Sequence, residues 1–458
     1  MRRALALALL AAACSKAPDQ PDAGPPAWKP GTVYRTERQA NARGYLDRRG
    51  LIHAHSVYSH DACDNQPKND AGEYDPQCFE DFRDGLCKSQ HDFVFLTDHR
   101  ESFDDTEYPD TLLYRQARGD VLIDHGAGPT ANRLACPDGA PAPLVLAGNE
   151  TKMMPVGLER HADGRGSTYG DISDAGIEKI HQAGGLAIMA HTESANLDDL
   201  INVGLDGFEM YNLHANSLKN LAIAADWALK LDAKMFDGLP DPNIFLIGYN
   251  LEDPVYLERW GTVLSRGVKR VTTMGTDCHR NTLPQLAQDG ERVDSYRRMM
   301  SMFSNHLLVT PRGTDGTIDD RDLKEALKAG RLYGSFDFLG YPEGFEFVAK
   351  TNGGTVYEMG STAPVGAVLE AKLPRVQGGV ETSAELPTLK LNLYVARDGG
   401  WDVLAAGNAD LSYTADTPGA YRVEVRMVPK HLKAHVGRRQ DLLKAERPWV
   451  YSNAIYVQ

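Results

Sequence analysis

The feature that most constrains the fold is an alternation, from residue 50 to about 340, between short apolar runs and stretches with helical patterns. Runs such as DFVFLTDH and GLAIMAH are apolar almost throughout, as expected for parallel strands that are buried on both faces. Between the runs lie helix candidates such as DAGIEKIHQAG and DPVYLERWGTVLSRG. Repeated strand–helix units of this kind predict an α/β domain, which we place at residues 49–340.

The pattern changes after about residue 340. Segments such as LKLNLYVAR and AYRVEVRMV alternate polar with β-branched or aromatic residues and are separated by Gly and Pro. This pattern is typical of antiparallel strands, so we predict a small β-sandwich domain over residues 341–458. The helical stretch DDRDLKEALKAG is expected to close the first domain, and 458 residues are enough for two cores.

Composition excludes one class of partner. A hydrophobic content of 42% and a charged content of 24% are typical of a soluble globular protein. The formal net charge is −14, and no basic stripe is present that could neutralise phosphates, so we expect no nucleic-acid partner. Nothing in the pattern indicates an oligomeric state.

The N-terminus has the pattern of an export signal. In MRRALALALLAAACSK, two arginines precede a ten-residue apolar run that is too short to span a bilayer. Small residues followed by Cys14 resemble a bacterial lipoprotein cleavage site; the alternative is an ordinary signal peptide cut after Ala13. We therefore expect a signal peptide at residues 1–13, a flexible tether at residues 14–48, and anchoring of lipidated Cys14 in the cell envelope, at the outer membrane.

Export favours disulfide bonds among the remaining cysteines. Four of them lie in polar insertions and predict two disulfides, with three possible pairings: Cys63, Cys78, Cys87 and Cys136. No CxxC spacing supports a zinc cluster. Cys278 lies between two potential ligands and is expected to point the other way, into the core.

Nearly every apolar run of the first domain ends in a potential metal ligand. The C-terminal ends of barrel strands face one common cleft, so these side chains are expected to meet there. So many carboxylates and imidazoles would repel one another or be costly to bury without cations, which indicates a polynuclear metal site. The residues at the run ends are His53 and His55, Asp98 and His99, Glu150, His191, and Asp277 and His279.

Together these motifs resemble the PHP (polymerase and histidinol phosphatase) superfamily of metal-dependent hydrolases. HAHSVYSHD, TDH, GNE, MAH and GTDCH occur in the family's order, and the resemblance covers about residues 49 to 340. ALKAGRLYGS and the ending RPWVYSNAIYVQ resemble the carbaryl-hydrolase-like branch, in which a small β domain follows. The resemblance implies a distorted (β/α)7 barrel that holds two or three divalent ions; zinc, manganese and iron all suit this mixture of ligands.

Carried over residue by residue, the resemblance implies three ion positions. The ligand sets are His53, His55, Glu150 and Asp277; Glu150, His161 and His191; and Asp61, His99 and His279. His161 lies in a loop after Glu150, and His125 is its poorer alternative. Asp61 is preferred to its neighbour His60, which could substitute for it.

Several further residues are expected in or near the cleft. Asp61 and His99 are placed at the reacting centre, while Arg100 and Arg280 flank ligands and could clamp an anionic substrate, unless they are solvated surface residues. Asp98 is expected to hydrogen-bond a ligand histidine or to cap a helix. Glu209 and Asn212 are expected to line the cleft.

The function predicted from this set is hydrolysis of a small anionic ester, first of all a phosphoester. Paired cations lower the pKa of a bridging water and neutralise the charge that develops on a phosphoryl or carbonyl oxygen. A carbamate, carboxyl-ester or amide hydrolase with the same metals is the alternative, and a non-catalytic lipid-anchored binding protein is a third reading. An amidohydrolase barrel would need Lys in place of Glu150, and no Gly-x-Ser-x-Gly elbow supports a serine hydrolase.

Overall fold

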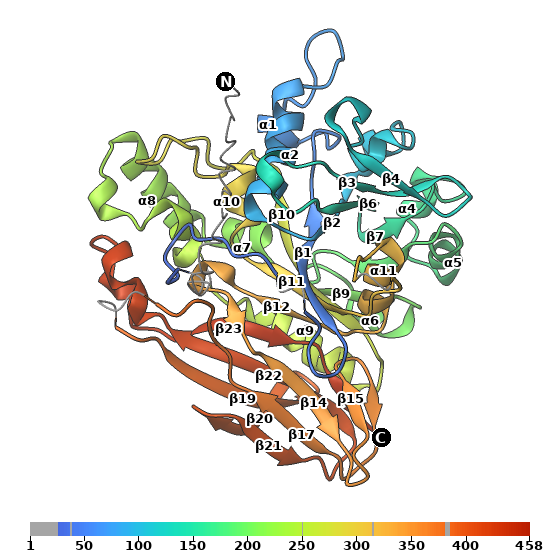
Figure 1. The fold of residues 1–458 in the computed structure, drawn as a ribbon, viewed down its shortest axis with the longest axis vertical. Coiled ribbons are helices and arrows are strands. Elements are labelled where there is room, and N and C mark those ends of the chain that lie inside the picture. The colour runs from blue at the N-terminus through green and yellow to red at the C-terminus, as the bar shows by residue number, and fades with distance from the viewer. Residues whose placement is uncertain (1–25, 37–38, 250, 314–315, 381–384) are drawn as a thin grey trace, which may run out of the picture.

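The computed structural model describes residues 26–36, 39–249, 251–313, 316–380 and 385–458 (Figure 1). The expected signal peptide, Cys14 and the first part of the expected tether lie outside these residues. No helix of the described chain is long and apolar enough to cross a membrane.

Seven strands of the described chain close a barrel, in the order β1, β2, β6, β7, β8, β9, β10 and back to β1. The α/β class is therefore confirmed. The predicted (β/α)7 repeat is not clearly matched. β7 follows β6 after a two-residue turn and runs antiparallel to both neighbours. In the described chain, the connection from β2 to β6 contains the four-residue α3 (Arg100–Phe103), short 3-10 turns and a hairpin in place of a long helix. The seven strands are β1 (Leu46–Ala54), β2 (Phe93–Phe95), β6 (Leu144–Glu150), β7 (Met153–Leu158), β8 (Leu186–Met189), β9 (Gly207–Asn212) and β10 (Val271–Cys278).

Helices on the outside of the barrel begin where the sequence provides caps. The carboxylate of Asp75 accepts hydrogen bonds at the start of α2, and Asp319 forms a capping box with Asp322 at the start of α11. The longer helices are α2 (Pro76–Ser89), α5 (Asp174–Gln182), α8 (Leu221–Asp232), α9 (Pro254–Ser265) and α11 (Asp320–Lys328). Shorter ones are α1 (Ala62–Asn65), α3 (Arg100–Phe103), α4 (Gly166–Tyr169), α6 (Leu197–Asn202), α7 (Leu213–Lys219) and α10 (Tyr296–Met300).

The C-terminal part consists of antiparallel sheets, as expected, but it is not a detached domain. The first half of β1 pairs with β11, and the sheet continues through β12, β23, β22 and β19 to β20 (lower half of Figure 1). These strands are β11 (Ser304–Val309), β12 (Leu332–Ser335), β19 (Thr388–Arg397), β20 (Gly400–Gly407), β22 (Gly419–Val428) and β23 (Arg447–Ser452). A second sheet contains β14 (Glu346–Lys350), β15 (Val356–Glu358), β17 (Val368–Lys372) and β21 (Leu411–Thr414). β1 is thus shared between the barrel and the C-terminal sheet.

Helix α9 lies against this sheet through a buried arginine. The guanidinium of Arg422 lies 4.4 Å from the ring of Trp260 on α9 and 4.5 Å from that of Trp401 on β20. Glu424 pairs with it at 3.0 Å. A Cβ on Gly261 would lie 1.8 Å from the carbonyl oxygen of Gly400, so the helix and the strand approach as closely as glycine allows.

The structure bears on three further predictions from the sequence. The two disulfides are confirmed, with the pairing Cys63–Cys78 and Cys87–Cys136, and Cys278 is buried in the core. The tether is wrong from about residue 26 onward, because Trp28 is 3% exposed and donates its backbone N–H to Gly379 at 2.9 Å.

Candidate metal centre

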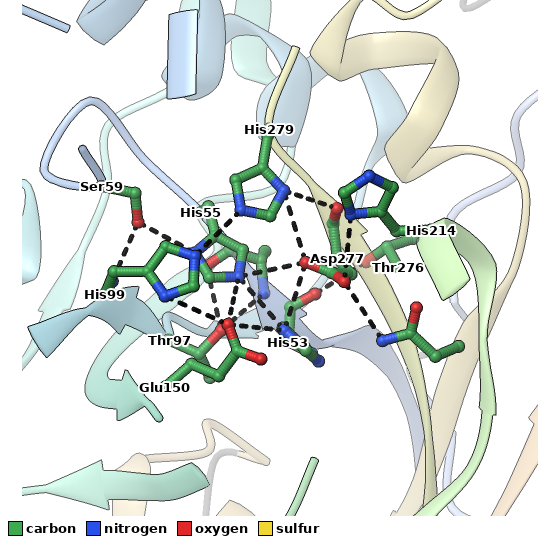
Figure 2. Close-up of polar contacts among 12 residues, drawn as sticks. His53, His55, Ser59, Thr97, His99, Glu150, His214, Thr276, Asp277 and His279 are labelled. Carbon is green, nitrogen blue, oxygen red and sulfur yellow. Dashed lines mark hydrogen bonds and ion pairs between the residues drawn. The ribbon is translucent and has the colours of Figure 1, made fainter. Parts of the chain in front are cut away.

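The potential ligands meet at the C-terminal ends of the barrel strands (Figure 2). They come from the end of β1, from β3 (Asp98–His99), from the last residue of β6, from the residues after β8, and from the end of β10. The structure brings together eight of the nine residues predicted as ligands: His53, His55, Asp61, His99, Glu150, His191, Asp277 and His279.

One group of four ligand atoms has the spacing of a tetrahedral ion site. The Nε2 atoms of His53 and His55 lie 3.1 Å apart, and each lies 3.2–3.5 Å from Oε2 of Glu150 and Oδ1 of Asp277. An ion about 2.0–2.1 Å from each of four ligand atoms would hold those atoms about 3.3–3.4 Å apart. These four buried residues therefore form a group that can hold a metal ion, as the sequence predicted.

The second oxygens of the two carboxylates face another group. Oε1 of Glu150 lies 2.9 Å from Nε2 of His191, and Oδ2 of Asp277 lies 3.5 Å from the same nitrogen. Nδ1 of His214 lies 3.4 Å from Oδ2 of Asp277. Because each carboxylate presents one oxygen to either side, Glu150 and Asp277 are placed to bridge two neighbouring ions.

A third group forms an equilateral triangle. Oδ2 of Asp61, Nε2 of His99 and Nε2 of His279 are each 3.4 Å from the other two. His60 is 57% exposed in its side chain and lies 3.8 Å from Glu101, so Asp61 rather than His60 joins the triangle.

Two carboxylate oxygens are left open in this cluster. Oδ1 of Asp61 and Oδ1 of Asp277 are buried and accept no hydrogen bond from the described residues. Oδ1 of Asp277 has imidazole nitrogens 3.2–3.3 Å away but no hydrogen bond in the described chain, which is the arrangement expected of ligand atoms that share a cation, so the donor set fits two or three divalent ions.

A second layer of side chains orients the histidines. Oε1 of Glu209 lies 2.6 Å from Nδ1 of His53. Oγ of Ser59 lies 2.8 Å from Nδ1 of His55 and donates to Asp98, whose pKa burial raises to about 6. Such contacts fix the ring orientation of metal-binding histidines. Asp98 is expected from the sequence to hydrogen-bond a ligand histidine, and it acts on His55 indirectly, through Ser59. Glu209 is expected only to line the cleft, but it contacts the ring of His53 directly.

The backbone is strained at three of the potential ligands. His53, His191 and Asp277 have φ of 81°, 47° and 51°. Non-glycine residues seldom adopt the left-handed region, and each such conformation costs about 1–3 kcal/mol. The pairing of β1 with β10 shifts register between Ile52 and Ala54, so a bulge at His53, rather than simple alternation along the strand, aims its ring at the cluster.

A glycine makes room for the second layer. A Cβ on Gly275 of β10 would lie 1.9 Å from Oε1 of Glu209 and 3.0 Å from Nδ1 of His53. The hydrogen bond between Glu209 and His53 therefore depends on the absence of a side chain at position 275.

The electrostatics of the cluster favour charged carboxylates and charge some of the imidazoles, whereas burial lowers the pKa of His55 and His279 and keeps these two rings neutral. Burial by itself raises the pKa of Glu150 and Asp277, but His53, together with His191 at Glu150 and with His279 and His214 at Asp277, outweighs burial and holds both pKa values well below the ordinary range. Burial lowers the pKa of His99 and His191, but Asp61 and Glu150 more than reverse this, to about 9 and about 11. In the metal-free protein, protons therefore neutralise the charge that a divalent cation can replace.

Three predicted site residues lie outside the cluster. His161 is wrong as a ligand, because its Nδ1 contacts the hydroxyl of Tyr169 at 3.2 Å and its Nε2 contacts the carbonyl of Thr106 at 3.0 Å. Arg100 donates to the carbonyl of Gly166 at 3.3 Å. Arg280 pairs with Asp81 at 3.3 Å, although it lines a pocket beside Asp277 and His279.

His214 is a potential ligand that was not predicted from the sequence. Its imidazole enters the cluster from α7, two residues after β9 ends at Asn212, so the missed signal was a histidine just beyond a strand end. His125, the poorer alternative to His161, contacts Asp320 at 2.8 Å instead.

Comparisons with protein-family models, with curated proteins and with solved structures find no match to this chain.

Replacing one histidine inside the cluster and one outside it tests the boundary of the site. We expect His191→Ala to lower the metal content measured by inductively coupled plasma mass spectrometry, because it removes a nitrogen from the group that Glu150 bridges. His161→Ala is the matched control and should retain the full content. Equal metal content in the two variants would contradict this placement.

Metal uptake should release protons. At pH 7.5 the rings of His99 and His191, with pKa of about 9 and about 11, are protonated, and coordination requires their neutral forms. His53 is protonated as well, because Glu209 and Asp277 outweigh burial and hold its pKa well above the ordinary range. We expect about three protons to be released per fully loaded chain, and the apparent affinity to rise with pH between 6 and 9. Calorimetric titration with Mn²⁺ in buffers of different ionisation enthalpy measures this release; identical heats in all buffers would contradict it.

Proposed function

We propose that this chain is a metal-dependent hydrolase of the PHP type that cleaves phosphoesters. The observation that carries the proposal is the sharing of Glu150 and Asp277 between two groups of imidazoles, beside the triangle of Asp61, His99 and His279. The closed seven-stranded barrel with ligands at its strand ends supports the proposal, while the antiparallel β7 and the lack of a long helix between β2 and β6 in the described chain depart from a (β/α)7 repeat.

Divalent cations supply Lewis acidity and lower the pKa of water, which is the chemistry that phosphoester hydrolysis requires. Glu150 and Asp277 would hold two ions side by side, since each presents one oxygen to each group. Glu209 and Ser59 would keep Nε2 of His53 and of His55 aimed at the first ion.

Asp61 and His99 lie where the substrate would approach. Their side chains are among the more exposed of the cluster, and the carboxylate of Asp61 raises the pKa of His99 against the effect of burial. If two ions are bound, His99 would hold a proton that it could donate to the leaving oxygen of the substrate. If a third ion is bound, His99 would instead coordinate that ion.

A second candidate is hydrolysis of a carboxylic or carbamic ester with the same ligands. It is favoured by the arginines, since Arg100 and Arg280 both contact groups of the protein and are not arranged as a clamp for a dianion. The expected export and the lipid anchor at Cys14 remain part of the proposal and rest on residues 1–14 of the sequence.

Activity can be tested with the manganese-loaded or zinc-loaded protein. We expect turnover of p-nitrophenyl phosphate or bis-p-nitrophenyl phosphate, and a loss of at least about 100-fold in kcat/KM for His55→Ala, which removes a ligand. His161→Ala should retain the activity, because that ring lies outside the cluster. Turnover of p-nitrophenyl acetate alone would favour the second candidate, and activity that His55→Ala leaves intact would contradict both.

A further inference from the structure

A small pocket adjoins the metal centre. Its volume is about 50 Å³, and His214, Asp277 and His279 of the cluster form one wall. The other walls are mainly apolar side chains from α7, α8, the 3-10 helix Pro242–Gly248 and the segment 283–293: Leu218, Leu221, Ala224, Leu246, Leu283 and Val293. A group held here would therefore lie directly beside the carboxylate of Asp277.

The mouth of the pocket exposes two leucines. Leu218 and Leu221 are 54% and 61% exposed, and both line the same opening. Leu246 and Leu283 lie deeper and are buried. Single exposed leucines are common on protein surfaces, but two that border one opening next to a metal centre provide apolar surface that a substrate can cover.

The charged side chains that line the pocket are already engaged. The carboxylate of Asp294 accepts the backbone N–H groups of Thr282 and Leu283, at 2.7 and 2.8 Å, and pairs with Arg292 at 2.6 Å. Arg280 pairs with Asp81. Beyond the metal cluster, the described residues therefore offer no unengaged charge to a ligand in the pocket, which favours an uncharged group.

We propose that this pocket binds a short alkyl group of the substrate while the ester centre lies at the metal cluster. The inference rests on the proposed hydrolytic function and adds the substrate class, an ester with a small aliphatic substituent. A cavity of about 150 Å³ holds benzene, so a pocket of about 50 Å³ fits a chain of roughly two to four carbons rather than an aromatic ring.

Alkylphosphonates test the pocket without turnover. Binding of methyl-, ethyl-, propyl-, hexyl- and phenylphosphonate to the manganese-loaded protein is measured by calorimetry. We expect affinity to rise about fourfold per methylene from methyl to propyl, the factor that burial of one methylene provides. Hexyl- and phenylphosphonate should bind no tighter than propylphosphonate. Methyl- and propylphosphonate that bind equally, or do not bind, would overturn the proposal.

Variants of residues that line the pocket test whether the dependence of phosphonate affinity on chain length arises there. Leu218→Ser and Ala224→Phe should abolish the gain from methyl to propyl, the first by removing apolar surface and the second by filling the pocket. Leu229→Ser is the matched control on α8, since Leu229 is 70% exposed and does not line the pocket. A chain-length gain that survives both pocket variants would overturn the proposal.

The proposed function and the pocket can fail separately. Turnover that depends on His55, together with phosphonate binding that ignores chain length, would retain the hydrolase and remove the alkyl subsite. A chain-length gain that is lost in Leu218→Ser, in a protein that turns over none of the p-nitrophenyl esters, would retain the subsite and remove the hydrolase.

Discussion

The shared position of two buried carboxylates, Glu150 and Asp277, is the constraint on which the site depends. Burying an uncompensated carboxylate costs on the order of several kcal/mol, so these two require positive charge on both sides. Imidazoles supply it in the metal-free protein: His53, whose pKa Glu209 and Asp277 hold well above the ordinary range against the effect of burial, faces one oxygen of each carboxylate, and His191 lies 2.9 Å from the other oxygen of Glu150. The buried negative charge that keeps these imidazoles protonated in the metal-free protein also favours the binding of divalent cations.

The surrounding fold is adapted to hold these groups at fixed positions. Closing the barrel brings β1, β6 and β10 together at one end, and the bulge at His53 turns its ring toward the cluster. Gly275 leaves room for Glu209 to contact Nδ1 of His53, on the side of the ring away from the cluster. Ser59 makes the corresponding contact with Nδ1 of His55. The strain at His53 and at Asp277 is thus offset by contacts that determine where their side chains point.

Much of this could be predicted from the sequence, because apolar runs that end in His, Asp or Glu specify both a barrel and a common rim. What failed depended on loops and tertiary contacts. His161 follows a strand by only a few residues, but Tyr169 and Thr106 engage its ring. His214 was missed because it lies on a helix. The continuous sheet from β1 to β20 arises from pairings between distant segments, which local patterning does not encode.

Anomalous diffraction from crystals loaded with zinc or manganese would test the central claim, that this cluster is a polynuclear metal centre. We predict a strong peak enclosed by His53, His55, Glu150 and Asp277, about 2.0–2.2 Å from its ligand atoms, and a second peak beside His191 that shares Glu150. A map in which the cluster is empty, while the disulfide sulfurs of Cys63 and Cys78 are clearly visible, would contradict the account.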